Sequence, residues 1–317
     1  MHVLIYGGGA VGLGIASCLL RSECSVDIVA RPETVAALRT EGLVRTGLFG
    51  SSRAEPGSFG AFDCLAEVTG EAYDFVLVCT KSFDSARAAQ DLADHQDRIG
   101  TSTRFVLFQN GWGNAEVFAT RFPAQRIYNA RVITGFHRHR PNEVEVTVHA
   151  DAIHVGTLFG GDLAPLVPLC RSIHAGGIPC EPTDAVGKDL WAKMLYNCAL
   201  NPLGAILKVS YGVLAEHATS RELMDCIIAE VFTAMSAAGH QTHWPSAAAF
   251  IRIFYERLVP DTASHRSSML QDITAGKRTE IDALNGAVIA LAEKHRVVAP
   301  YNRAVYDLVK FVEGAAA

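Results

Sequence analysis

The chain has 317 residues, and at about 150 residues per domain this length predicts two domains. Hydrophobic residues make up 49% and charged residues 19%, which provides enough apolar material for a buried core and excludes global disorder. The 28 basic and 33 acidic residues give a net charge of -5. This balance argues against a protein that binds nucleic acid or an anionic membrane, because both require clustered positive charge.

The eight cysteines form no Cys-x-x-Cys pair, so neither a zinc ribbon nor a thioredoxin site is indicated. Several lie in apolar runs, as buried free thiols do, and this usage is typical of a cytoplasmic protein. The uncharged stretch 2–20 has no basic n-region and is interrupted early by glycines, which predicts a strand, a turn and a helix rather than a signal peptide. No transmembrane helix is predicted, because the longest uncharged span, 231–251, contains histidines and a proline.

The first half of the chain alternates β-branched runs with helical stretches. The predicted strands are 2–6, 25–30, 73–80 and 103–108, and the predicted helices are 10–21, 34–41 and 84–95. This alternation predicts an α/β domain with a doubly wound, Rossmann-type sheet. The stretches 143–149 and 152–157 alternate polar and apolar residues, which predicts antiparallel additions to that sheet.

The second half shows helical periodicity throughout. The predicted helices are 186–207, 214–239, 245–258, 265–275 and 280–295. Glycines and prolines within 176–182 indicate an inter-domain turn. We therefore expect an α/β domain over residues 1–184 and an all-helical C-terminal domain over residues 185–317.

A glycine-rich motif lies between the first strand and the first helix. It consists of Gly7, Gly8, Gly9, Ala10, Val11 and Gly12 and matches G-x-G-x-x-G. The first glycine permits a tight turn, the second lets a pyrophosphate approach the backbone, and the third lets the helix pack close to the strand. The helix N-terminus supplies N–H groups and partial positive charge for phosphates. The motif therefore predicts a dinucleotide site, and a glycine-rich turn that binds nothing is the alternative.

The end of the second strand distinguishes the two nicotinamide cofactors. A site for NAD usually has an acidic residue there, whereas this strand ends at Arg31. A guanidinium can pair with a 2′-phosphate, so the sequence favours NADPH. An ordinary surface arginine is the alternative.

Three polar residues are spaced four apart on the first helix of the second half. Lys193, Asn197 and Asn201 therefore form one stripe, and Pro202 is expected to kink the helix just after it. A lysine and two amides among apolar residues are costly to bury without partners. The stripe either lines a cleft or is a solvated face.

These pieces, taken together with four others, carry a family resemblance. The others are Cys79-Thr80-Lys81, Gln109-Asn110-Gly111, Ser267-Ser268-Met269-Leu270-Gln271-Asp272 and Thr279-Glu280-Ile281-Asp282. In this order and spacing the chain resembles the ketopantoate reductase family from about residue 1 to 312. The resemblance implies that a Rossmann domain binds NADPH, a helical domain covers it, and a 2-oxo acid is reduced in the cleft.

The resemblance also implies roles for individual residues. The family's proton-donor lysine matches Lys193, which could stabilise charge on the carbonyl oxygen and protonate it. Its substrate-binding residues match Asn197, Asn201 and Ser268, and its cofactor contacts match Lys81 and Asn110. Its cofactor-side glutamate matches Glu280, which could hold either the lysine or the nicotinamide ribose. Without the resemblance, Ser268 could be a helix cap and Glu280 a solvated carboxylate.

The chain departs from the family pattern at one position. Tyr211 stands where the family has a further substrate asparagine. This difference does not affect the predicted reaction type, but it leaves the identity of the 2-oxo acid open. The alternative is that the segment takes another path and that Tyr211 only packs.

Other candidates for function are weaker. The run 137–140 (His-Arg-His-Arg) could bind phosphate or metal but is more simply solvated, and His240 and His243 lack a third ligand, so no metal site is predicted. Trp112 either lines the cofactor cleft or packs.

The sequence predicts an NADPH-dependent reductase of a 2-oxo acid, most simply 2-dehydropantoate. The expected NADP(H)-binding domain is 1–184, and the expected catalytic domain is 185–317. A reductase of another keto acid and a non-catalytic NADP(H)-binding regulator are the alternatives. The expected partner is a small-molecule substrate, with no nucleic acid or membrane, and a homodimer is left open.

Overall fold

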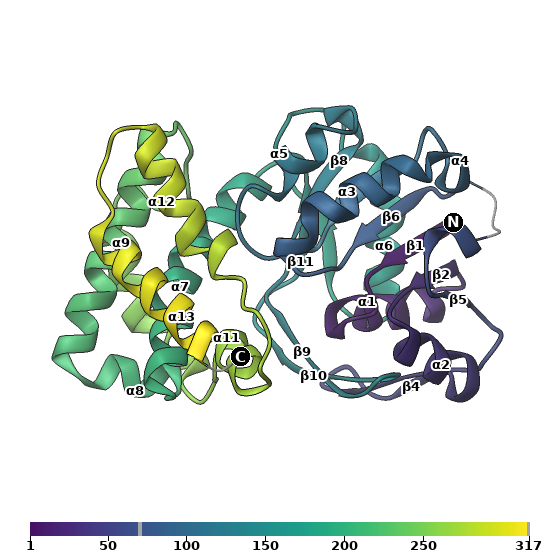
Figure 1. The fold of residues 1–317 in the computed structure, drawn as a ribbon, viewed down its shortest axis with the longest axis horizontal. Helices are drawn as coiled ribbons and strands as arrows, with labels where there is room; N and C mark the ends of the chain where they lie inside the picture. Colours follow the sequence, from purple (N-terminus) through teal and green to yellow (C-terminus); the bar gives the residue numbers. More distant parts are fainter. Residues whose placement is uncertain (69–71, 316–317) are drawn as a thin grey trace. The chain divides into compact units, whose positions relative to one another are not determined.

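The structure is a computed structural model that describes residues 1–68 and 72–315 (Figure 1). The chain forms two compact units. The first contains Met1–Gln109 and Asn114–Val186, and the second contains Asn110–Gly113 and Gly187–Ala317. The short segment Asn110–Gly113 thus belongs to the second unit although the chain on both sides of it belongs to the first. The boundary between the two units follows Val186, two residues beyond the predicted domain boundary after residue 184.

A mixed sheet forms the centre of the first unit. Over the described residues it has eight strands in the order β12-β11-β8-β7-β6-β1-β2-β5. Their bounds are β1 His2–Tyr6, β2 Ser25–Val29, β5 Gly60–Phe62, β6 Phe75–Val78, β7 Arg104–Leu107, β8 Ile127–Arg131, β11 Ile153–Gly156 and β12 Cys180–Pro182. Strands β5 to β8, β1 and β2 run parallel, and β11 runs antiparallel to β8. The predicted antiparallel strand within 152–157 is confirmed.

Helices cover both faces of this sheet, as the doubly wound prediction requires. Their bounds are α1 Ala10–Arg21, α2 Pro32–Glu41, α3 Ser85–Asp94, α4 Gln96–Ile99, α5 Asn114–Ala119 and α6 Val167–Ala175. Strand β1 shows the two faces: Val3 and Ile5 pack in one core with α1 and α6, whereas Leu4 packs in another with α3 and α5. This alternation follows from the two-residue period of a strand.

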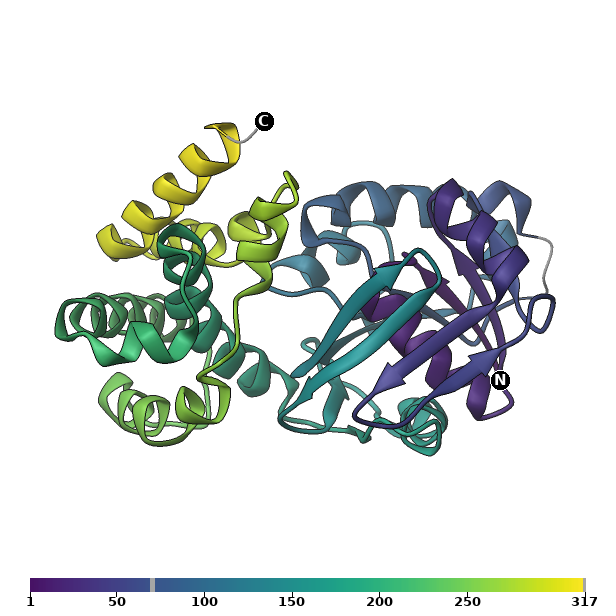
Figure 2. The same ribbon diagram turned by 90° about the horizontal axis from the view of Figure 1, so that it is seen from below.

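The prediction for 143–149 was wrong about its sheet. This strand, β10 (Glu143–His149), lies in a separate sheet of order β4-β3-β10-β9. The others are β3 Leu43–Gly47, β4 Ser52–Ala54 and β9 Thr134–Arg140. The alternation of β10 reflects one buried face, since Val144 and Val146 join the core that contains α1. Figure 2 shows the teal β9–β10 hairpin beside the purple helix α1, which it contacts.

The second unit consists mainly of helices. Their bounds are α7 Val186–Leu207, α8 Tyr211–Glu216, α9 Ala218–Ala237, α10 Ala247–Ile253, α11 Ser268–Thr274, α12 Asn285–Lys294 and α13 Pro300–Ala315. The predicted bounds of α7 are confirmed. The predicted helix 214–239 is two helices, because the backbone at His217 is extended. The predicted helix 245–258 ends in a π-helical turn at Phe254–Leu258, and α13 was not predicted.

A buried asparagine compensates for the proline inside α7. Pro202 has no N–H, so the carbonyl of Cys198, four residues earlier, loses its usual helix partner. The Nδ2 group of Asn285, at the start of α12, donates to this carbonyl at 3.1 Å and to Oδ1 of Asn302 at 3.0 Å. All three residues are fully buried. This contact lets α7 run unbroken past the stripe of polar residues.

Candidate functional site

The glycine motif forms the turn that the sequence predicts. Gly7 has φ +117°, and a Cβ there would lie 2.8 Å from the backbone of Cys79 and Thr80 at the end of β6. A Cβ on Gly12 would lie 2.0 Å from the carbonyl oxygen of Gly7. Gly9, the N-cap of α1, faces open space, with nothing within 4 Å of such an atom. Only glycine fits at positions 7 and 12, and Gly9 leaves the backbone accessible, as a phosphate-binding loop requires.

Arg31 and Lys81 each follow a strand of the parallel sheet. Arg31 comes two residues after β2 and is the exposed N-cap of α2. Lys81 comes three residues after β6 and begins a short turn. Gln109 donates from Nε2 to Oγ1 of Thr80 at 3.1 Å and to the backbone oxygen of Lys81 at 3.3 Å, so the ends of β6 and β7 are linked. In a doubly wound sheet, the carboxyl ends of the strands are where ligands bind.

Lys193, Asn110 and Glu280 form a hydrogen-bonded chain within the second unit. The Nζ group of Lys193 donates to Oδ1 of Asn110 at 2.6 Å, and Nδ2 of Asn110 donates to Oε2 of Glu280 at 3.0 Å. Glu280 is only 7% exposed, whereas Lys193 and Asn110 are partly exposed. The structure thus brings an ammonium and a carboxylate to the two ends of one amide.

The segment after Asn110 explains how that amide reaches the helical unit. Gly111 has φ +89°, and a Cβ there would lie 2.3 Å from the backbone oxygen of Ala283. The N–H of Trp112 donates to the same oxygen at 2.9 Å. The ring of Trp112 packs on Trp191 of α7 at 4.6 Å between centroids. Trp112 therefore packs within the second unit and fixes the position of Asn110.

The two asparagines of the stripe are buried next to Lys193 on α7. Asn197 is 9% exposed and Asn201 is 6% exposed. Oδ1 of Asn201 accepts a hydrogen bond of 2.6 Å from the hydroxyl of Tyr211. Burial raises the pKa of Tyr211 well above its ordinary value, so this hydroxyl remains a donor. The stripe is a buried polar feature rather than a solvated face.

Ser268 is exposed at the first position of α11, and the residue before it has the capping role. Ser267 is fully buried, accepts from the N–H of Leu270 at 3.0 Å and donates to the backbone oxygen of Asn201 at 3.2 Å. The alternative that Ser268 is a helix cap was wrong. Sequence reasoning missed Ser267 because either of two adjacent serines can satisfy the same cap pattern.

The remaining histidine candidates have structural partners. His243 contacts the carboxylate of Asp189 at 2.7 Å, and the ring of His240 packs on Trp112 at 4.7 Å. His139 contacts Glu145 at 2.7 Å. Among the described residues, no group of three or more His, Cys, Asp or Glu side chains could hold a metal. Within the same ranges, no helix is long and apolar enough to cross a membrane.

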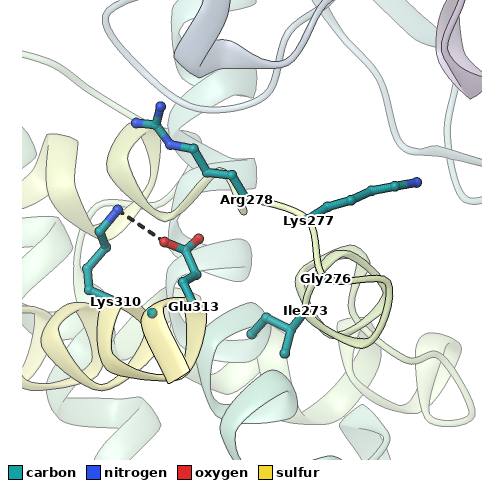
Figure 3. Close-up of a pocket in the computed structure, with 7 residues that line it drawn as sticks. Ile273, Gly276, Lys277, Arg278, Lys310 and Glu313 are labelled. Atoms are coloured by element: carbon teal, nitrogen blue, oxygen red, sulfur yellow. Dashed lines mark ion pairs between the residues drawn. The ribbon is translucent and has the colours of Figure 1, made fainter. Parts of the chain in front are cut away.

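A cavity of about 360 Å³ lies in the second unit between α11 and α13 (Figure 3). It is lined by Ile273, Gly276, Lys277, Arg278, Lys310, Glu313 and Gly314. Figure 3 shows the ion pair of Lys310 with Glu313, with Lys277 extending away from it. Oε1 of Glu313 accepts from the N–H of Thr279 at 2.7 Å and so anchors the segment that carries Glu280. None of the expected site residues lines this cavity.

Comparisons with known proteins agree with the resemblance. A family model described as "Ketopantoate reductase PanE/ApbA" matches residues 3–160, and its C-terminal counterpart matches residues 185–313. A 2-dehydropantoate 2-reductase of Aquifex aeolicus is 33% identical over 314 residues, 99% of this chain and 97% of that protein.

Solved structures share the fold over the whole chain. A PanE/ApbA family ketopantoate reductase from Ralstonia eutropha has a TM-score of 0.86 at 29% identity, covering 100% of this chain and 99% of that one. A D-mandelate dehydrogenase, solved with NADH and anilino(oxo)acetate, has the same TM-score and coverage at 22% identity and shows the fold alone. The two family models and the Aquifex relative together show that the chain belongs to the ketopantoate reductase family.

Proposed function

We propose that this protein reduces 2-dehydropantoate to pantoate with NADPH. The observation that carries the proposal is the series of hydrogen bonds that joins Lys193, Asn110 and Glu280. In it, Nζ of Lys193 lies 2.6 Å from the amide oxygen of Asn110. The named relative from Aquifex and the two family models support the same reaction.

Lys193 is proposed as the proton donor. Reduction of a ketone places negative charge on its oxygen, and an ammonium within hydrogen-bond distance would stabilise that charge and supply the proton. Asn110 holds Nζ of the lysine from one side. The carboxylate of Glu280 orients the other end of the amide, so Glu280 is proposed to act on the lysine through Asn110 and to contact the cofactor.

Asn197, Asn201 and Ser268 are proposed to hold the substrate. The amides are buried on the face of α7 that carries Lys193, and each can donate to a carboxylate or accept from a hydroxyl. Ser268 is exposed at the start of α11, where its hydroxyl is accessible to a carboxylate.

The first unit is proposed to bind NADP(H), the group that supplies the hydride. The backbone at Gly7, Gly9 and Gly12 has the close approaches and open space that a pyrophosphate requires, and the first turn of α1, including Ala10 and Val11, supplies N–H groups. Arg31 is proposed to pair with the 2′-phosphate. Lys81 and Asn110 are proposed as further cofactor contacts.

A reductase of a different 2-oxo acid is the second candidate. Tyr211 takes the place of a family asparagine and uses its hydroxyl on Asn201. This contact changes what the asparagine can offer a substrate. A structural neighbour named D-mandelate dehydrogenase, solved with anilino(oxo)acetate, supports this candidate.

The location and assembly of the protein are also proposals. All eight cysteines are free, which supports a reducing, cytoplasmic setting. The net charge of -5 supports the absence of a nucleic-acid partner. A homodimer remains a prediction, and sedimentation equilibrium of the purified protein would measure it.

Steady-state assays with NADPH and a panel of 2-oxo acids test the proposal. The panel includes ketopantoate, pyruvate, 2-oxoisovalerate and phenylglyoxylate. Ketopantoate with the highest kcat/KM supports the first candidate, and a preference for another acid supports the second. Tight NADPH binding without turnover of any acid would favour a non-catalytic regulator.

A further inference from the structure

The basic run 137–140 lies on strand β9, and its members have different partners. Arg140 pairs with the carboxylate of Glu41 at 2.9 Å, and His139 contacts that of Glu145 at 2.7 Å. Arg138 instead donates from Nη1 to the backbone oxygen of Gly8 at 3.2 Å and to Oγ1 of Thr34 at 3.2 Å. It is the member of the run that reaches the glycine motif.

The packing of β9 on α1 explains this reach. A Cβ on Gly14 would lie 2.3 Å from the ring of Phe136, so the helix admits that ring only because position 14 is glycine. Side chains two residues apart on a strand point the same way. Arg138 therefore extends from the same face as Phe136, toward the start of α1.

The charge of Arg138 has no acidic partner in the described part of the chain. Across residues 1–68 and 72–315, no carboxylate oxygen lies within 4.0 Å of its guanidinium, and both of its acceptors are neutral. The side chain is only partly exposed. The nearby Glu33, in the first turn of α2, is exposed and makes no ion pair with it within that distance. A partly buried cation without a counter-charge is suited to an anionic ligand.

We infer that Arg138 is a second cation, beside Arg31, for the 2′-phosphate of NADPH and so determines the preference for NADPH over NADH. The inference rests on the proposed function. Thr34, which Arg138 contacts, lies in the first turn of α2, three residues after Arg31. This turn follows β2, where Rossmann folds recognise the ribose 2′ position. Arg138 from strand β9 and Arg31 from the turn after β2 would therefore bind the same phosphate.

Equilibrium binding of intact protein tests the inference without turnover. Dissociation constants for NADPH and NADH are measured by nucleotide fluorescence, and those for adenosine 2′,5′-bisphosphate and AMP by competition. The variant is Arg138→Gln, and the matched control is Arg140→Gln, two residues along the same strand. We expect Arg138→Gln to weaken NADPH and the bisphosphate about tenfold, the effect of losing one charge-assisted hydrogen bond, and to leave NADH and AMP within about twofold. Arg140→Gln should change none of them.

The other possible binding results for Arg138→Gln would contradict the inference. Equal weakening of NADPH and NADH by Arg138→Gln would mean that Arg138 only shapes the loop through Gly8, and the inference would be wrong. Unchanged affinities would also overturn it while leaving the proposed function intact. Arg138→Lys separates charge from shape, because it should recover part of the NADPH affinity only if the charge acts on the phosphate. Wild-type protein that does not bind NADPH would overturn the proposed function and the inference together.

Discussion

The hydroxyl of Tyr211 donates a hydrogen bond of 2.6 Å to Oδ1 of Asn201. The phenol ring is 2% exposed, and its edge packs against Tyr196 at 5.8 Å between centroids. The tyrosine therefore uses one of the two lone pairs of this amide oxygen and leaves Nδ2 as the main group that can meet a substrate. A substrate oxygen that accepts a hydrogen bond fits this arrangement better than a hydroxyl that must donate one.

The first prediction concerns Tyr211→Phe. Loss of the donor leaves Oδ1 of Asn201 unpaired in a buried position, which costs about 1–3 kcal/mol. The amide should then lose its fixed orientation, and KM for the 2-oxo acid should rise roughly tenfold with little change in kcat. The control is Tyr196→Phe, which removes another tyrosine hydroxyl contact, a partly buried one to Thr262 at 2.5 Å. Equal effects of both variants on KM would contradict a specific role for Tyr211.

The second prediction concerns Tyr211→Asn, which restores the family residue. The smaller amide should leave room for the ketopantoate hydroxyl and offer it both a donor and an acceptor. We expect kcat/KM for ketopantoate to rise relative to that for a 2-oxo acid without a hydroxyl. The measurement is the ratio of the two specificity constants in wild type and variant. An unchanged ratio would mean that Tyr211 lies outside the substrate site.

The third prediction is that Lys193→Ala lowers kcat by on the order of 10²-fold or more, the usual range for a general acid. The dissociation constant for NADPH should stay near the wild-type value, because the lysine is proposed to act on the substrate. Lys188→Ala is the control, since Lys188 is an exposed lysine five residues earlier on the same helix. Near-normal turnover by folded Lys193→Ala protein would exclude this residue as the proton donor.

Sequence reasoning predicted the parts of the fold with an uninterrupted pattern. The bounds of α1 and α7 were confirmed because apolar periodicity runs through each helix from a glycine turn or an inter-domain turn. Strand β10 was placed in the wrong sheet, because alternation reports a buried face but not the strand beside it. The break between α8 and α9 was missed, because neither glycine nor proline marks it.

The candidate site was only partly predictable, because its residues come from segments that are far apart in the sequence. The four-residue spacing of Lys193, Asn197 and Asn201 places them on one face of a helix from local geometry alone. Asn110 is 83 residues from Lys193 and 170 from Glu280, so no spacing rule could have joined them. The resemblance named these residues, and the structure supplies their contacts. Their roles in catalysis and binding stay predictions.

The fourth prediction concerns Arg31→Ala. Loss of a guanidinium contact with the 2′-phosphate, worth about 1.5–3 kcal/mol, should raise KM for NADPH at least tenfold and leave KM for NADH nearly unchanged. Arg53→Ala is the control, because Arg53 is an exposed arginine paired with Glu55 on the same unit. Equal use of NADPH and NADH by the wild type would contradict the assignment of the cofactor.

The last prediction concerns the stability of the helix that carries Lys193. Asn285→Ala removes the donor to the Cys198 carbonyl, which Pro202 cannot replace, so the free energy of unfolding should fall by about 1–3 kcal/mol. Pro202→Ala returns a backbone N–H four residues after that carbonyl. Pro202→Ala should therefore stabilise the Asn285→Ala protein more than it stabilises the wild type. Urea unfolding of the wild type, the two single variants and the double variant measures this difference as a coupling energy. If Pro202→Ala has the same effect in both backgrounds, Asn285 is not the substitute partner of this carbonyl, and its contact with Asn302 would account for the loss.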